Sequence, residues 1–137
     1  MKPTKALILA PMEPSYTPIL DTIKETLLHH SIHPIMIDKV SSPSAVWSNA
    51  VTDAIQEADL IVADVSRKNA NVLYELGFAH ALRKPTLLLL STDEKGDMPF
   101  DLAGYQMITY DPRNLLPLRR QIQLILDYQQ SRGVWEL

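Results

Sequence analysis

Five short runs of mostly apolar residues alternate along this chain with four longer segments of helical periodicity, and that alternation is the strongest constraint on its fold. The expected strands are Lys5–Ala10, Pro34–Asp38, Leu60–Ala63, Thr86–Leu90 and Gln106–Tyr110. Three of these runs are apolar almost throughout, which is typical of central strands in a parallel sheet buried on both faces. The sequence therefore predicts an α/β fold in which helices cover both faces of a five-stranded parallel sheet.

The helical segments carry apolar residues at intervals of three and four positions. They are expected at about Thr17–His30, Ser42–Glu57, Val72–Arg83 and Asn114–Gln130. The pairs Thr17-Pro18 and Ser42-Pro43 are typical helix starts, because proline is favoured at the first helical position. With 137 residues, of which 46% are hydrophobic, the chain is expected to form a single domain spanning 1–137.

The composition argues against several classes of partner. Charged residues make up 21% of the chain and the formal net charge is -3, so we expect neither nucleic acid nor an anionic membrane as a partner. There is no cysteine, and the apolar run Thr86–Leu90 is far too short to span a bilayer. His29, His30 and His33 lack an obvious acidic residue to complete a metal site. We therefore expect a cytoplasmic protein with no resident cofactor or metal.

Glu75 breaks the pattern of the third helix. At 100° per residue, Val72, Leu76 and Ala79 share a broad apolar arc. Glu75 lies inside that arc, and Asn71 stands one turn earlier on the same face. The free backbone N–H groups of a helix start favour an anion there. Two interpretations stay open, a functional carboxylate or a glutamate that caps a loop or its own helix.

Two stretches of the chain resemble a known family. They are Ala-Asp-Leu-Ile-Val-Ala-Asp64-Val-Ser with the following Asn69-Ala-Asn71-Val-Leu-Tyr-Glu75-Leu-Gly77, and Met98-Pro-Phe-Asp101-Leu-Ala-Gly104-Tyr105. Both are similar to the nucleoside 2-deoxyribosyltransferase superfamily, and especially to its branch described as TIR-like or nucleotide-binding. The resemblance covers about residues 5–111.

The resemblance implies a flavodoxin-like strand order, 2-1-3-4-5, whose ligand crevice opens between the first and third strands at their carboxyl ends. It also implies that Glu75 is the catalytic residue, because deoxyribosyltransferases and TIR-domain NAD hydrolases carry a catalytic glutamate on the helix after the third strand. The residues expected to bind substrate are Pro11, Met12, Asp38, Asp64, Ser66, Asn69, Asn71 and Tyr105. For Asp38, capping of its own loop is an equal alternative.

The expected roles follow from the chemistry of a nucleoside. Asp64 and Asn71 are candidates to bind ribose hydroxyls, and Ser66 and Asn69 to bind a hydroxyl or a phosphate. Tyr105 is a candidate to stack on the base. Breaking an N-glycosidic bond builds positive charge on the sugar, which a fixed carboxylate stabilises or attacks.

Several functions remain open at this point. The leading hypothesis is cleavage or transfer at the N-glycosidic bond of a nucleoside, a nucleotide or NAD, with Glu75 as nucleophile or as the stabilising charge. The alternatives are a non-catalytic nucleotide-binding signalling module and a pure interaction domain. Asn69 stands where the transferases usually carry aspartate, and their C-terminal asparagine has no clear counterpart here. The resemblance also implies a homodimer or a higher homo-oligomer.

Overall fold

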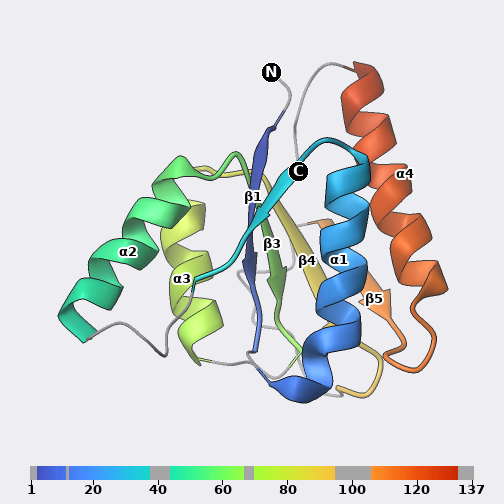
Figure 1. Cartoon of the computed structure of the whole chain (residues 1–137), viewed down its shortest axis with the longest axis horizontal. Coiled ribbons are helices and arrows are strands. Elements are labelled where there is room, and N and C mark those ends of the chain that lie inside the picture. Colours follow the sequence, from blue (N-terminus) through green and yellow to red (C-terminus); the bar gives the residue numbers. More distant parts are fainter. Residues whose placement is uncertain (1–2, 12, 38–43, 67–69, 95–105, 133–137) are drawn as a thin grey trace.

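The structure, a computed structural model, describes residues 3–11, 13–37, 44–66, 70–94 and 106–132 (Figure 1). Its elements are β1 (Lys5–Leu9), the 3-10 helix η1 (Pro14–Tyr16), α1 (Thr17–His29), β2 (His33–Ile35), α2 (Ser44–Glu57), β3 (Leu60–Asp64), α3 (Ala70–Ala81), β4 (Thr86–Ser91), β5 (Gln106–Tyr110) and α4 (Leu116–Arg132). The five strands lie in the order β2-β1-β3-β4-β5 and all neighbours are parallel. The predicted fold class and strand order are therefore confirmed.

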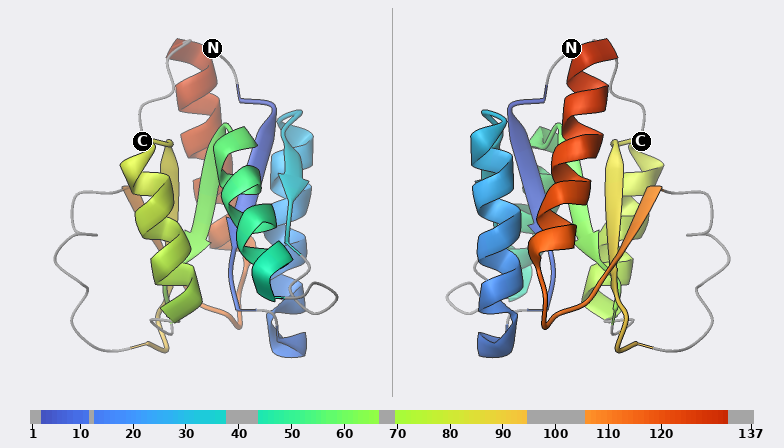
Figure 2. Two further views of the ribbon diagram at one scale, coloured as in Figure 1. Left: turned by 90° about the vertical axis from the view of Figure 1, so that its left-hand side faces the viewer. Right: turned by 90° about the vertical axis from the view of Figure 1, so that its right-hand side faces the viewer.

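The sheet separates two hydrophobic cores. Helices α1 and α4 cover one face and helices α2 and α3 cover the other, as Figure 2 shows from two sides. Along β1, Ala6 and Ile8 point into the core beneath α1 and α4, whereas Leu7 and Leu9 point into the core beneath α2 and α3. Because each central strand supplies both cores, its sequence is apolar at consecutive positions and shows no alternation.

Strand β2 is shorter than the sequence predicted. It runs only from His33 to Ile35, where we expected a strand over Pro34–Asp38. It lies at the edge of the sheet and pairs with β1 alone, so it gains backbone hydrogen bonds on one side only. The helix η1 was not predicted from the sequence.

Helices α1 and α3 end in the same way. Just after each helix, one residue adopts the left-handed conformation that glycine adopts most easily. These residues are Ser31, with φ 60, and Arg83, with φ 57. The N–H of the next residue then donates to a carbonyl of the last turn, that of Leu27 at 2.9 Å or that of Ala79 at 3.1 Å. These bonds close the helices and turn the chain back toward the amino ends of β2 and β4.

His30 joins the two helices on one face of the sheet. Its Nδ1 atom lies 2.9 Å from the carbonyl oxygen of Thr26, and its Nε2 atom lies 2.8 Å from Oδ1 of Asp127 on α4. Within the described ranges, no group of three His, Asp or Glu side chains is arranged to hold a metal ion.

No helix in the part of the chain that the structure describes combines the length and the apolar character needed to cross a bilayer.

Two leucines test the assignment of the core. Leu88, on β4, has no exposed surface, whereas Leu124, on α4, is 68% exposed. We expect Leu88→Ala to lower the free energy of unfolding by about 2–5 kcal/mol, because it leaves a cavity in the core between the sheet and helices α2 and α3. Leu124→Ala deletes the same atoms from the surface and should change that free energy by less than about 0.5 kcal/mol. Urea denaturation measures both variants, and equal losses would contradict this placement of the core.

Candidate active site

Glu75 is buried, as its helical position predicted. It lies on the second turn of α3 and is 1% exposed, within an α3 face on which Val72, Leu76 and Ala79 are 2%, 1% and 0% exposed. Its Oε2 atom is enclosed by protein. Burying a carboxylate is costly, and an aspartate or glutamate is seldom fully buried without a specific reason. The side chain of Glu75 therefore lies between α3 and the sheet and does not face solvent as most glutamates do.

The direction of winding reverses between β1 and β3, beside the start of α3. Strands β1 and β3 are neighbours and end level with each other, with Leu9 paired to Ala63. The chain leaves β1 toward α1 on one face and leaves β3 toward α3 on the other face (Figure 1). In parallel α/β sheets, ligands usually bind at the carboxyl ends of two strands between which the chain diverges in this way.

A buried carboxylate occupies the end of β3. Asp64 is 2% exposed, and its Oδ2 atom accepts hydrogen bonds from the hydroxyls of Tyr16 at 2.6 Å and Tyr110 at 2.5 Å. Its Oδ1 atom accepts from the backbone N–H of Ser66 at 2.9 Å and from the hydroxyl of the same serine. We call Tyr16, Asp64, Ser66 and Tyr110 the Asp64 cluster. Both carboxylate oxygens are thus engaged within the protein.

The Asp64 cluster extends to the neighbouring strands. The hydroxyl of Ser66 accepts the N–H of Ser91 at 2.8 Å, at the end of β4. The carbonyl of Tyr110, at the end of β5, accepts the N–H of Thr92 at 2.8 Å. Since Tyr16 belongs to η1, which follows β1, one network joins the carboxyl ends of β3, β4 and β5 with the segment after β1.

The two tyrosines keep their protons. Burial raises the pKa of Tyr16 and of Tyr110, and the nearby charge of Asp64 with its hydrogen bonds raises both pKa values further. Each phenol is therefore a donor throughout the range in which proteins are normally studied. A buried charge that accepts several hydrogen bonds of this kind is compensated within the fold.

The structure places the predicted site residues in different surroundings. Asp64 and Ser66 bind each other, and Pro11 is buried next to the end of β1. Asn71 lies on the first turn of α3 with an exposed side chain. Four predicted residues lie outside the described part of the chain, namely Met12, Asp38, Asn69 and Tyr105. The substrate contacts of all eight residues stay predictions.

Sequence reasoning missed Tyr16 and Tyr110. Their signal was an aromatic residue with a hydroxyl at two of the segments that meet at the carboxyl edge of the sheet, where Asp64 also lies. The contact itself joins residues separated by 48 and 46 positions, which no local pattern reveals.

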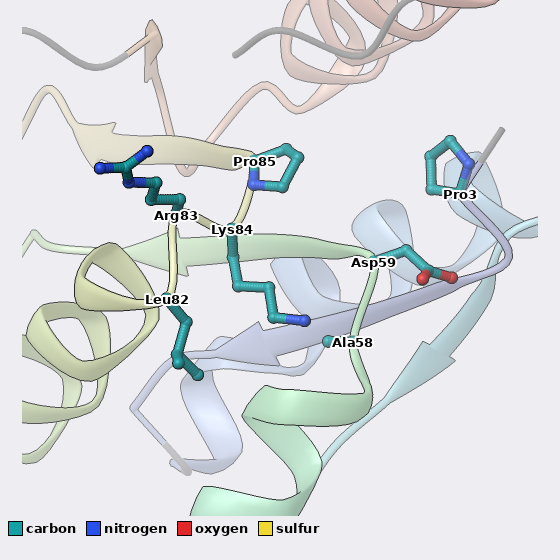
Figure 3. A pocket seen from close by; sticks show the side chains of 7 residues that line it. All are labelled: Pro3, Ala58, Asp59, Leu82, Arg83, Lys84 and Pro85. Carbon is teal, nitrogen blue, oxygen red and sulfur yellow. The ribbon is translucent and has the colours of Figure 1, made fainter. Parts of the chain in front are cut away.

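A cavity of about 380 Å³ opens at the opposite edge of the sheet, at the amino ends of its strands. It is lined by Pro3, Ala58, Asp59, Leu82, Arg83, Lys84 and Pro85 (Figure 3). Its Lys84 ammonium donates to the carbonyl of Gln56 at 2.7 Å, and Figure 3 shows the Arg83 guanidinium directed away from Asp59. The cavity is therefore separate from the end of the sheet at which α3 begins.

The chain is similar to known proteins in sequence and in fold. The chain is 33% identical over 92 residues to a candidate 2′-deoxynucleoside 5′-phosphate N-hydrolase of Syntrophotalea carbinolica. The match covers 66% of the chain and spans 64% of the length of that relative. No family model matches the chain.

Two solved structures share the fold. One is the CMP N-glycosidase BcmB of Clostridium botulinum, with a TM-score of 0.63, 20% identity, and coverage of 83% of this chain and 96% of the other. The second is a 2-deoxyribosyltransferase of Bacillus psychrosaccharolyticus, with a TM-score of 0.67, 12% identity, and coverage of 96% and 97%. At these identities the likeness concerns the fold.

The Asp64 cluster predicts a stability effect. Tyr16→Phe removes one of the two hydroxyl donors to Oδ2 of a buried carboxylate, so we expect the free energy of unfolding to fall by about 1.5–3 kcal/mol. Tyr128→Phe removes a hydroxyl from a tyrosine that is 57% exposed on α4 and should change it by less than about 0.5 kcal/mol. Chemical denaturation compares the two variants, and a Tyr16→Phe protein as stable as the wild type would contradict the cluster.

Asp59 predicts a dependence of stability on pH. Burial opposes ionisation of Asp59, but hydrogen bonds from the N–H and hydroxyl of Thr4 and the N–H of Lys5, with the charge of Lys84, outweigh it and lower its pKa. Because the folded pKa lies below the unfolded one, this contribution is complete above about pH 4 and is lost as the pH falls through the folded pKa. Asp59→Asn should therefore be less stable than the wild type at pH 7, with a difference that shrinks at pH 2–3. Denaturant titrations at both pH values measure it, and an unchanged difference would contradict the assignment.

Proposed function

We propose that this chain, whose relatives support its membership of the nucleoside 2-deoxyribosyltransferase-like family, cleaves the N-glycosidic bond of a nucleoside or nucleotide. The relatives carry names of an N-hydrolase, an N-glycosidase and a deoxyribosyltransferase, which all act at the bond between a sugar and a base. The match spans 64% of the length of the curated relative, so the activity and the substrate of this chain are proposed and not inferred directly from that relative.

One observation carries the proposal, the burial of Glu75. A glutamate with 1% exposure on the sheet-facing side of α3 has given up most of its hydration. It lies on α3, the helix that follows β3 and begins at the carboxyl edge of the sheet, where β1 and β3 are neighbours. A buried acidic side chain on a helix that begins at the carboxyl edge of a parallel sheet is a candidate for a functional role. A carboxylate fixed in this way needs no solvent reorganisation when charge develops next to it.

The proposed chemistry uses this carboxylate on the sugar. As the bond between C1′ and the base nitrogen lengthens, positive charge grows on the ring, and the negative charge of Glu75 stabilises it. If the carboxylate bonds to C1′, the base leaves with the bonding electrons, and water or an acceptor base later displaces Glu75 from the sugar. Reaction with water gives hydrolysis, and reaction with a second base gives transfer.

The proposed partners are small molecules and further copies of the chain. A substrate with a 5′-phosphate is supported by the name of the curated relative, and NAD remains a candidate through the TIR-like resemblance. Self-association is supported by large apolar side chains on the outer surface of α4, where Leu116 and Leu124 are 52% and 68% exposed.

Replacement of Glu75 by glutamine tests the proposal directly. Glu75→Gln keeps the size of the side chain and removes its charge, so release of free base should fall by at least about 100-fold. The matched control is Glu25→Gln, since Glu25 is an exposed glutamate on α1. Chromatography of reactions with nucleosides, their 5′-monophosphates and NAD measures the released base. If no substrate in the panel releases a base, or if Glu75→Gln is as active as Glu25→Gln, the proposed cleavage is wrong.

Binding without turnover is the alternative that the same panel detects. A nucleotide that raises the melting temperature and is recovered intact would indicate a nucleotide-binding module.

A further inference from the structure

We propose that Tyr16 and Tyr110 are positioning residues that act through Asp64 on the segment that carries Glu75. This inference rests on the proposed function, because it assigns to these residues the placement of the carboxylate that acts on the sugar. It also changes the interpretation of Asp64, which the sequence indicated as a ligand of the ribose.

The geometry of the Asp64 cluster fixes the carboxylate in one orientation. Its Oδ2 atom receives two hydroxyls from the side of η1 and β5, and its Oδ1 atom receives the N–H and hydroxyl of Ser66. The two sets of donors lie on opposite oxygens, so the carboxylate links them as a bridge. A rotation that breaks the bonds on one oxygen also displaces the bonds on the other.

Ser66 is where this bridge meets the catalytic helix. It is the last described residue after β3, and α3 begins at Ala70 after a short connection. Its backbone N–H is bonded to Asp64, and its hydroxyl accepts the N–H of Ser91 on β4. The chain is therefore anchored immediately before the segment that leads to Glu75. The tyrosine hydroxyls hold Asp64, Asp64 holds Ser66, and Ser66 thereby anchors the chain four positions before Ala70, the first residue of α3.

Loss of this anchor should affect the reaction more than binding. Catalysis depends on the distance between the carboxylate and C1′, and a displacement of about 1 Å is enough to lower a rate by about 100-fold. Contacts with the rest of the substrate contribute to binding and tolerate a displacement of that size better. A fall in kcat at nearly constant KM is the signature of an interaction made chiefly in the transition state.

The required feature is the set of hydrogen bonds, and not the charge of Asp64. In an Asp64→Asn variant, the N–H of Ser66 keeps the amide oxygen at the Oδ1 position, since a backbone N–H only donates. The amide NH₂ then faces the two tyrosine hydroxyls, which can turn and accept from it. Asn at this position therefore preserves the bridge without a charge, whereas alanine removes it.

The kinetic test uses two phenylalanine variants and one matched control. In the purified full chain, with the substrate identified from the nucleoside and nucleotide panel, Tyr16→Phe and Tyr110→Phe should each lower kcat by about tenfold or more while KM changes by less than about threefold. Tyr128→Phe, at an exposed tyrosine on α4, should match the wild type. Asp64→Asn should retain at least about tenfold more kcat than Asp64→Ala.

A second measurement does not depend on activity. Hydrogen–deuterium exchange of the amides over residues 66–75 should be at least about tenfold faster in Tyr110→Phe than in Tyr128→Phe, with exchange in β1 unchanged. If Tyr16→Phe does not fold, Tyr110→Phe and Asp64→Asn still give both readouts.

The results distinguish the positioning role of the tyrosines from the proposed cleavage of the N-glycosidic bond. Folded tyrosine variants with wild-type kcat and wild-type exchange would overturn the positioning role, while an inactive Glu75→Gln would leave the proposed function in place. An Asp64→Asn protein as inactive as Asp64→Ala would also overturn it, because the charge would then be the required feature. Absence of base release by the wild type would defeat the proposed function, and the exchange measurement would still decide whether the tyrosines hold the start of α3.

Discussion

The carboxylate of Asp64 is the contact on which the carboxyl edge of the sheet depends. It is buried, so its charge is tolerated only because hydrogen bonds replace the water it has lost. The donors come from η1, from β5 and from the start of the connection to α3. Parallel strands bring these segments to one edge, and backbone hydrogen bonds continue only a short way past the strand ends, as from Val65 to Leu89 and from Thr92 to Tyr110. The carboxylate of Asp64 adds a shared acceptor that holds the segments together.

The structure contains two buried acidic residues near this edge with different surroundings. The side chain of Asp64 meets tyrosines that belong to the core beneath α1 and α4, whereas Glu75 belongs to the helix that packs with the core beneath α2 and α3. The hydrogen bonds of Asp64 are made within the fold. Glu75 is buried on the face of α3 that also carries Val72, Leu76 and Ala79, and it is the residue to which we assign the chemistry. From the sequence we expected Glu75 to be catalytic and Asp64 to bind the ribose, and the hydrogen bonds of Asp64 within the fold were not foreseen.

Much of the architecture could be predicted because it follows from local patterns. Uninterrupted apolar runs indicated doubly covered strands, and the position of Glu75 at 100° spacing indicated its burial. The extent of β2 was wrong because an edge strand is limited by its single partner, which a propensity does not describe. The tyrosine contacts of Asp64 could not be predicted, since they join distant segments through side chains that look unremarkable in sequence. For Met12, Asp38, Asn69 and Tyr105, the sequence remains the basis of their proposed roles.

The separation of the interior into two cores has a consequence for how such a chain can change. Residues of β1 and β3 alternate between the two cores, so neighbouring positions in one strand pack against different helices. Most side chains beneath α1 and α4 contact neighbours other than those of Glu75, and Tyr16 and Tyr110 are the exceptions because they reach Asp64. Apart from these tyrosines, the core beneath α1 and α4 can vary separately from the core beneath α2 and α3, which gives the fold room to diverge in sequence while the packing of α3 is kept.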